Sequence, residues 1–136
     1  MRIRVTVPED RSFVVVDDGL PAGLEAVDLS LLTAGGLPGP GAADSVATTE
    51  TGAAWWEYGS WDGGWWSPFD HRELRDDRVV YVARALWKGT WAATYVARAT
   101  TPGVFVRPPV HAEEMYNPAV YGRSDGGVFT VKPRTR

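Results

Sequence analysis

Alternating apolar and polar positions open the chain. Ile3, Val5 and Val7 fall on one face of an extended segment over Arg2–Val7, and arginine and threonine side chains fall on the other. Because successive side chains of a strand point to opposite faces, this alternation predicts a strand with one buried face. The run Ser12–Val16 is aromatic and β-branched without alternation, which predicts a second strand buried on both faces.

Short apolar segments separated by turn residues fill the second half of the chain. We expect strands over His71–Leu74, Arg78–Leu86, Thr90–Thr100, Val104–Arg107 and Val128–Val131. Thr101-Pro102-Gly103 predicts a type II turn, and Asp125-Gly126 predicts a two-residue hairpin turn. The patterns of Leu24–Leu32 and Ala112–Tyr116 fit either extended or helical structure. About seven short strands with frequent turns predict an all-β fold, an antiparallel β-sandwich.

A long segment over residues 33–68 interrupts this strand pattern and is interpreted as an insertion. Its first part is rich in glycine, proline, serine and threonine, and its second part holds five of the seven tryptophans. Three interpretations stay open for these side chains: a cover over the sandwich core, a contact with another domain or partner, or a platform for sugar rings. The tryptophans are Trp55, Trp56, Trp61, Trp65 and Trp66.

The composition narrows the classes of protein. A chain of 136 residues with 44% hydrophobic residues fits one globular domain over residues 1–136. Apolar runs are too short for a membrane span, and the N-terminal segment lacks the apolar region of a signal peptide. With 14 basic and 17 acidic residues, the balance argues against nucleic acid as a partner. The absence of cysteine excludes disulfides, thiolate metal sites and cysteine nucleophiles within this chain.

The densest group of polar residues lies around the expected strand His71–Leu74. Its acidic and histidine members are Asp70, His71, Glu73, Asp76 and Asp77, and Arg72, Arg75 and Arg78 are interleaved with them. Because arginines beside carboxylates usually form ion pairs, we expect a structural network at this turn and no metal site. The chain has only two histidines and no serine in a nucleophile-elbow pattern. We therefore expect no enzyme activity and no cofactor.

Met115 and Tyr116 form a second candidate site. The pair follows Glu113-Glu114 and precedes Asn117-Pro118, so it lies between a charged step and a turn. On a projecting segment, such a pair could fill a pocket on a neighbouring surface. The alternative, that both side chains pack into the domain's own core, stays open.

Four stretches of the chain resemble the last domain of bacterial alpha-2-macroglobulins and occur in the order expected for it. They read VVVDDGLPAGLE (14–25), HRELRDDRVV (71–80), YVARATTPG (95–103) and AEEMYNP (112–118). The resemblance implies a macroglobulin-type β-sandwich within a periplasmic or cell-envelope protease trap. In that family a protease cleaves a bait segment, the protein rearranges, and an activated thioester captures the protease.

The resemblance also implies a role for the terminal domain. That domain is not catalytic: it packs on the thioester domain, and a methionine–tyrosine pair, Met115 and Tyr116 here, helps to shield the thioester from water. A thioester would belong to other domains, because this chain has no cysteine.

The family's first strand begins upstream of Met1, which suggests a fragment of a larger multidomain protein or a short standalone relative. The partners would be the other domains of the parent protein and, indirectly, target proteases. The alternative is a standalone module that binds carbohydrate or protein through the tryptophan cluster.

Overall fold

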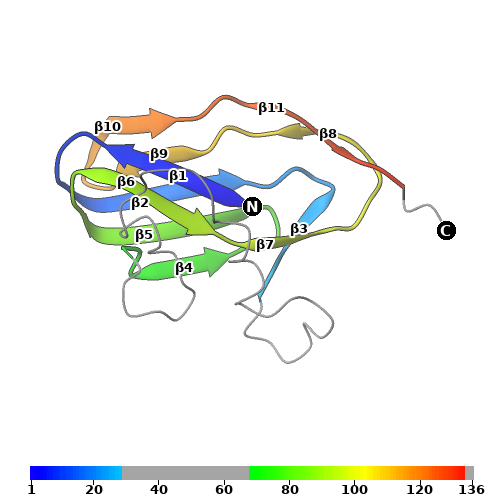
Figure 1. Cartoon of the computed structure of the whole chain (residues 1–136), viewed down its shortest axis with the longest axis horizontal. Helices are drawn as coiled ribbons and strands as arrows, with labels where there is room; N and C mark the ends of the chain where they lie inside the picture. Colours follow the sequence, from blue (N-terminus) through cyan, green and yellow to red (C-terminus); the bar gives the residue numbers. More distant parts are fainter. Residues whose placement is uncertain (29–67, 134–136) are drawn as a thin grey trace, which may run out of the picture.

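The computed structural model describes residues 1–28 and 68–133, and every regular element within these ranges is a strand (Figure 1). The prediction of an all-β chain is confirmed. Within the same ranges, no helix has the length and apolar character to cross a membrane. The strands are β1 (Arg2–Val7), β2 (Arg11–Gly19), β3 (Leu24–Val27), β4 (His71–Leu74), β5 (Arg78–Leu86), β6 (Gly89–Thr94), β7 (Val96–Ala99), β8 (Gly103–Arg107), β9 (His111–Glu114), β10 (Asn117–Arg123) and β11 (Gly127–Val131).

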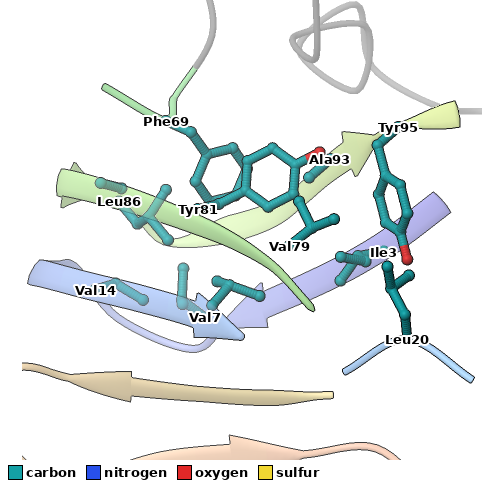
Figure 2. Packing of buried hydrophobic residues seen from close by; sticks show 12 residues of the cluster. Ile3, Val7, Val14, Leu20, Phe69, Val79, Tyr81, Leu86, Ala93 and Tyr95 are labelled. Carbon is teal, nitrogen blue, oxygen red and sulfur yellow. The ribbon is translucent and has the colours of Figure 1, made fainter. Parts of the chain in front are cut away.

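The strands form a sandwich of antiparallel sheets. The largest has five strands in the order β10-β9-β2-β5-β4, and the pairs β1-β6, β3-β7 and β8-β11 form two-stranded sheets. In Figure 2, apolar side chains from β1 and β6 face those from β2 and β5. The core cluster contains Ile3, Val7, Val14, Val16, Leu20, Phe69, Val79, Tyr81, Ala83, Leu86, Ala93 and Tyr95. Burial of these side chains supplies the main stabilisation of the fold.

Strand β2 is buried on one face, and the prediction of a strand buried on both faces is wrong. Val14, Val16 and Asp18 are buried, whereas the residues between them are partly accessible. The central position of β2, between β9 and β5, satisfies its backbone hydrogen bonds on both edges. The β-branched residues of β2 are therefore explained by its central position in the sheet, with only one side facing the core.

The expected strand Thr90–Thr100 is divided at Tyr95. Its first part, β6, pairs with β1, and its second part, β7, pairs with β3. Tyr95 lies at this change of partner, where its N–H donates to the carbonyl oxygen of Met1 at 3.1 Å. Leu24–Leu32 begins with strand β3, and its last four residues lie outside the described ranges. Gly103 has the expected positive φ, but its value of +156° departs from the roughly +80° of a type II turn.

Strands β8 to β11 form one long two-stranded ribbon. Gly127 pairs with Arg107 and Arg123 pairs with His111, so the register is continuous across the gap between the two ladders. At the gap, the Ser124 N–H donates to the carbonyl oxygen of Val110 at 3.0 Å. Because β11 pairs with β8 rather than with β10, the predicted hairpin at Asp125-Gly126 is wrong. The ribbon turns instead between β9 and β10.

Candidate functional site

Met115 and Tyr116 are the two turn residues at the tip of this ribbon, and we call them the tip pair. Glu114 and Asn117 form the last strand pair before the turn. Met115 is 48% exposed and Tyr116 is 79% exposed. The expectation of a projecting pair is confirmed, and the alternative that both pack into the domain's own core is wrong. The ambiguous segment Ala112–Tyr116 is a strand followed by a turn.

Strand β2 holds the tip pair in place. Strand β9 runs antiparallel to β2, with Val14 opposite Glu114. One residue further along, the Met115 N–H donates to the carbonyl oxygen of Phe13 at 2.8 Å. Arg11 Nη1 lies 3.8 Å from Glu114 Oε1, which adds an ion pair beside the turn. The backbone of the tip is thus tied to the central sheet.

Phe13 has a backbone conformation that few bulky residues adopt. Its φ is +53°, in the left-handed region, which costs about 1–3 kcal/mol for a residue other than glycine. Its ring meets the Tyr116 ring edge to face, with centroids 5.1 Å apart and planes at 81°. Phe13 could not be identified from the sequence, because an aromatic residue in a β-branched run predicts ordinary strand geometry. No local sequence signal distinguishes it.

The turn itself explains an irregularity in β10. Among the described residues, Phe13 alone combines a positive φ with a side chain, so neither turn residue is left-handed. In a two-residue hairpin, left-handed turn residues give the turn a twist that matches the twist of the flanking strands. A turn without left-handed residues matches that twist less well. The pairing accordingly shifts register between Asn117 and Tyr121. Pro118, in this shifted part, lies on an edge strand, where its missing N–H is tolerated.

A further exposed aromatic residue, Trp87, lies at the same end of the domain. The connections β1–β2, β5–β6 and β9–β10 all lie at the left end of Figure 1. Trp87 is 64% exposed, and its carbonyl oxygen accepts a 2.8 Å hydrogen bond from Trp91 Nε1. The Lys88 N–H donates to Asp10 Oδ1 at 2.8 Å, which ties this connection to β1–β2. The end of the domain that carries the tip pair therefore presents several apolar side chains to solvent.

The polar group around β4 is an arginine–carboxylate network, as predicted. Asp70 accepts hydrogen bonds from the Arg84 N–H at 2.6 Å and from Arg84 Nε at 2.9 Å, and these bonds lower the pKa of Asp70. Arg78 bridges Asp77 at 3.0 Å and Asp17 at 2.9 Å. Over residues 1–28 and 68–133, no group of three or more acidic or histidine side chains is arranged to hold a metal ion.

The predicted tryptophan site lies outside the described residues. This applies to all five side chains: Trp55, Trp56, Trp61, Trp65 and Trp66. The three interpretations of the cluster, as core cover, interface or sugar platform, remain predictions.

Comparison with known proteins agrees with this architecture. Residues 1–119 match the family described as the bacterial alpha-2-macroglobulin MG10 domain. An alpha-2-macroglobulin homolog of Nostoc sp. is 30% identical over 134 residues, which are 98% of this chain and 6% of the relative. The chain thus spans a small fraction of the length of this relative.

Solved structures show the same fold. A mutant of Salmonella alpha-2-macroglobulin superposes with a TM-score of 0.68 at 23% identity, over 97% of this chain and 7% of that one. Native Escherichia coli alpha-2-macroglobulin, in a structure that spans domain MG7 to the C-terminus, gives a TM-score of 0.59 at 23% identity. That match covers 97% of this chain and 19% of the other.

Proposed function

Because the chain belongs to the bacterial alpha-2-macroglobulin MG10 domain family, we propose that it is a non-catalytic domain of a protease-trapping inhibitor. In this proposal the chain is one domain of a longer polypeptide, close to its C-terminus. The tip pair packs on the domain that carries a reactive thioester and shields it from water. The parent protein works in the periplasm or at the cell envelope.

The exposed tip pair is the observation that carries this proposal. A methionine and a tyrosine that are 48% and 79% exposed leave apolar surface in water, and covering this surface with a partner would be favourable. Methionine adapts its shape to an irregular pocket, and tyrosine supplies a large apolar ring with a polar end. A thioester hydrolyses when water reaches it, so an apolar lid lengthens its lifetime.

The length of the relatives supports a multidomain parent. The chain covers 6% of the Nostoc relative, and a structure beginning at domain MG7 and running to the C-terminus contains its match. The chain has no cysteine, so the thioester would come from another part of the polypeptide. Together with family membership, this supports the proposal over a standalone carbohydrate-binding module.

A second exposed apolar surface fits the same setting. Val104 and Val106 on β8 and Val128 on β11 are 70%, 76% and 71% exposed, and Val106 lies directly opposite Val128. Contiguous exposed apolar side chains mark interaction surfaces. In this proposal other domains of the parent cover them.

Replacing both tip residues tests the function directly. In the macroglobulin that includes this chain, Met115→Ala with Tyr116→Ala should shorten the half-life of the thioester about tenfold, the factor expected for losing part of a buried apolar contact. The measurement is the loss of methylamine-reactive protein over time. Val128→Ala is the matched control, because Val128 is 71% exposed on the same ribbon and pairs with Val106, far from the tip. An unchanged half-life in the double variant, with the domain folded, would refute the shielding role.

A further inference from the structure

We propose that Phe13 is a positioning residue that fixes the Tyr116 ring in the orientation the tip pair needs for docking. This inference rests on the proposed function of the tip pair and adds a residue from a different strand. Phe13 lies at the start of β2, whereas Tyr116 lies 103 positions later in the chain at the β9–β10 turn. No local feature of either segment links them.

The left-handed backbone of Phe13 is not required by the sheet. Ser12 pairs with Ala85 and Val14 pairs with Ala83 on β5, whereas Phe13 is not among the paired residues. The register is the same on both sides of Phe13, so no residue is inserted there. A bulge would have explained the positive φ as an accommodation of an extra residue, and none is present here. Unfavourable backbone conformations persist where surrounding contacts determine them, and such positions concentrate at functional sites.

The contacts that hold Phe13 are with the tip pair. Its carbonyl oxygen accepts the Met115 N–H at 2.8 Å, and its ring packs edge to face on Tyr116 at 5.1 Å. Phe13 itself is 43% exposed, so its ring adds little to the core of the domain. The side chain is therefore placed to act on the surface turn rather than on the sandwich interior.

The ring contact limits the freedom of an otherwise exposed side chain. Tyr116 is 79% exposed, and an unrestrained ring of this kind would have to lose rotamer freedom on docking. A ring already oriented by Phe13 has less freedom to lose, and preorganisation of this kind strengthens binding. Phe13 thus contributes to shielding through Tyr116, without needing to contact the thioester itself.

Phe13→Gly separates positioning from structural support. Glycine adopts a positive φ without strain, so the variant keeps the backbone and loses only the ring. We expect a melting temperature equal to or above that of the wild type, loss of the ring-current shift of Tyr116 in NMR spectra of this chain, and thioester hydrolysis about two- to tenfold faster in the intact macroglobulin. That range corresponds to the strength of one edge-to-face aromatic pair. Phe13→Tyr, which keeps the ring, should restore wild-type hydrolysis.

The outcomes distinguish this inference from the proposed function. If Tyr116 keeps its ring-current shift in Phe13→Gly, the positioning role is wrong and the shielding role stands. If Tyr116→Ala accelerates hydrolysis but Phe13→Gly does not, the positioning role is again wrong. If neither variant accelerates hydrolysis, the shielding role fails and the positioning role fails with it. Should Phe13→Gly not fold, Phe13→Asn gives the same test, because asparagine tolerates the left-handed region.

Discussion

At the scale of single residues, Asp18 shows how the core accommodates a charge. The carboxyl is buried on the core-facing side of β2, where Tyr95 Oη donates a 2.7 Å hydrogen bond to Oδ2. Burial raises the pKa of Asp18 from its ordinary value of 3.8, although the Tyr95 hydrogen bond opposes this. Burial and the same hydrogen bond raise the pKa of Tyr95.

This shift makes stability depend on pH in an unusual direction. A folded-state pKa above 3.8 means that the folded protein binds the Asp18 proton more tightly than the unfolded chain does. The contribution of Asp18 is therefore fully present below pH 3.8 and is lost as the pH rises through the folded pKa. In Asp18→Asn this loss disappears, so the stability of the variant relative to the wild type should rise between pH 3 and pH 7.

Urea unfolding at several pH values measures this difference. Asp70→Asn is a control of opposite sign, because hydrogen bonds from Arg84 lower the pKa of Asp70. Its ionised form stabilises the fold above pH 3.8, and that stability is lost as the pH falls through the folded pKa. A pH-independent difference between Asp18→Asn and the wild type would contradict the assignment for Asp18.

At the scale of elements, the ribbon β8–β11 is packed against the β2–β3 connection through a close contact at one glycine. A Cβ added to Gly23 would lie 2.8 Å from two ring atoms of Phe105 and closer still to Cε2. The same ring also lies close to Gly103, where an added Cβ would be 2.9 Å from Cζ, so backbone flanks the ring on two sides. The absence of a side chain at Gly23 lets the ribbon approach this connection.

Gly23→Ala should therefore destabilise the domain by about 1–3 kcal/mol, the usual cost of forcing extra volume into a packed contact. The measurement is the urea midpoint of unfolding. Gly122→Ala is the matched control, because an added Cβ there meets nothing within 4 Å, and its midpoint should stay close to that of the wild type. An equal effect of both substitutions would show that the contact with Phe105 does not matter.

Strand positions could be predicted from sequence, but their partners could not. Arg2–Val7, His71–Leu74 and Arg78–Leu86 have the predicted bounds, because alternation and turn residues are local signals. The division at Tyr95 and the pairing of β11 with β8 depend on contacts between distant segments. The Asp125-Gly126 motif led to a wrong prediction because its turn propensity is a local property. The strand that follows it pairs with a distant segment, as the pair of Gly127 with Arg107 shows.

The candidate site could be predicted only in part, because local sequence signals indicate some of its residues and contacts between distant segments determine the others. The projection of Met115 and Tyr116 follows from their flanking residues, and the exposed fractions agree. Phe13 could not be found, since its role depends on a left-handed backbone and on a ring 103 positions away in sequence. The assignment of the arginine–carboxylate network succeeded because most of its charges lie within a few residues of one another.

At the scale of the whole molecule, the described residues include two groups of exposed apolar side chains. One lies at the end that carries Phe13, Met115, Tyr116 and Trp87, and the other is the valine face of β8 and β11. Among the described residues, no buried side-chain nitrogen or oxygen lacks a hydrogen-bond partner. In the proposed function, these two groups of side chains contact other domains of the parent protein.

The most direct test of the central claim is a site-specific crosslink from the tip. A photoreactive benzoylphenylalanine in place of Tyr116, in the intact native macroglobulin, should crosslink to the domain that carries the thioester, as identified by mass spectrometry of the joined peptides. The same photoreactive residue in place of Val128, which pairs with Val106 far from the tip, serves as the control and should give little of this product. Crosslinks from position 116 to other domains only, or none above the control, would contradict the account.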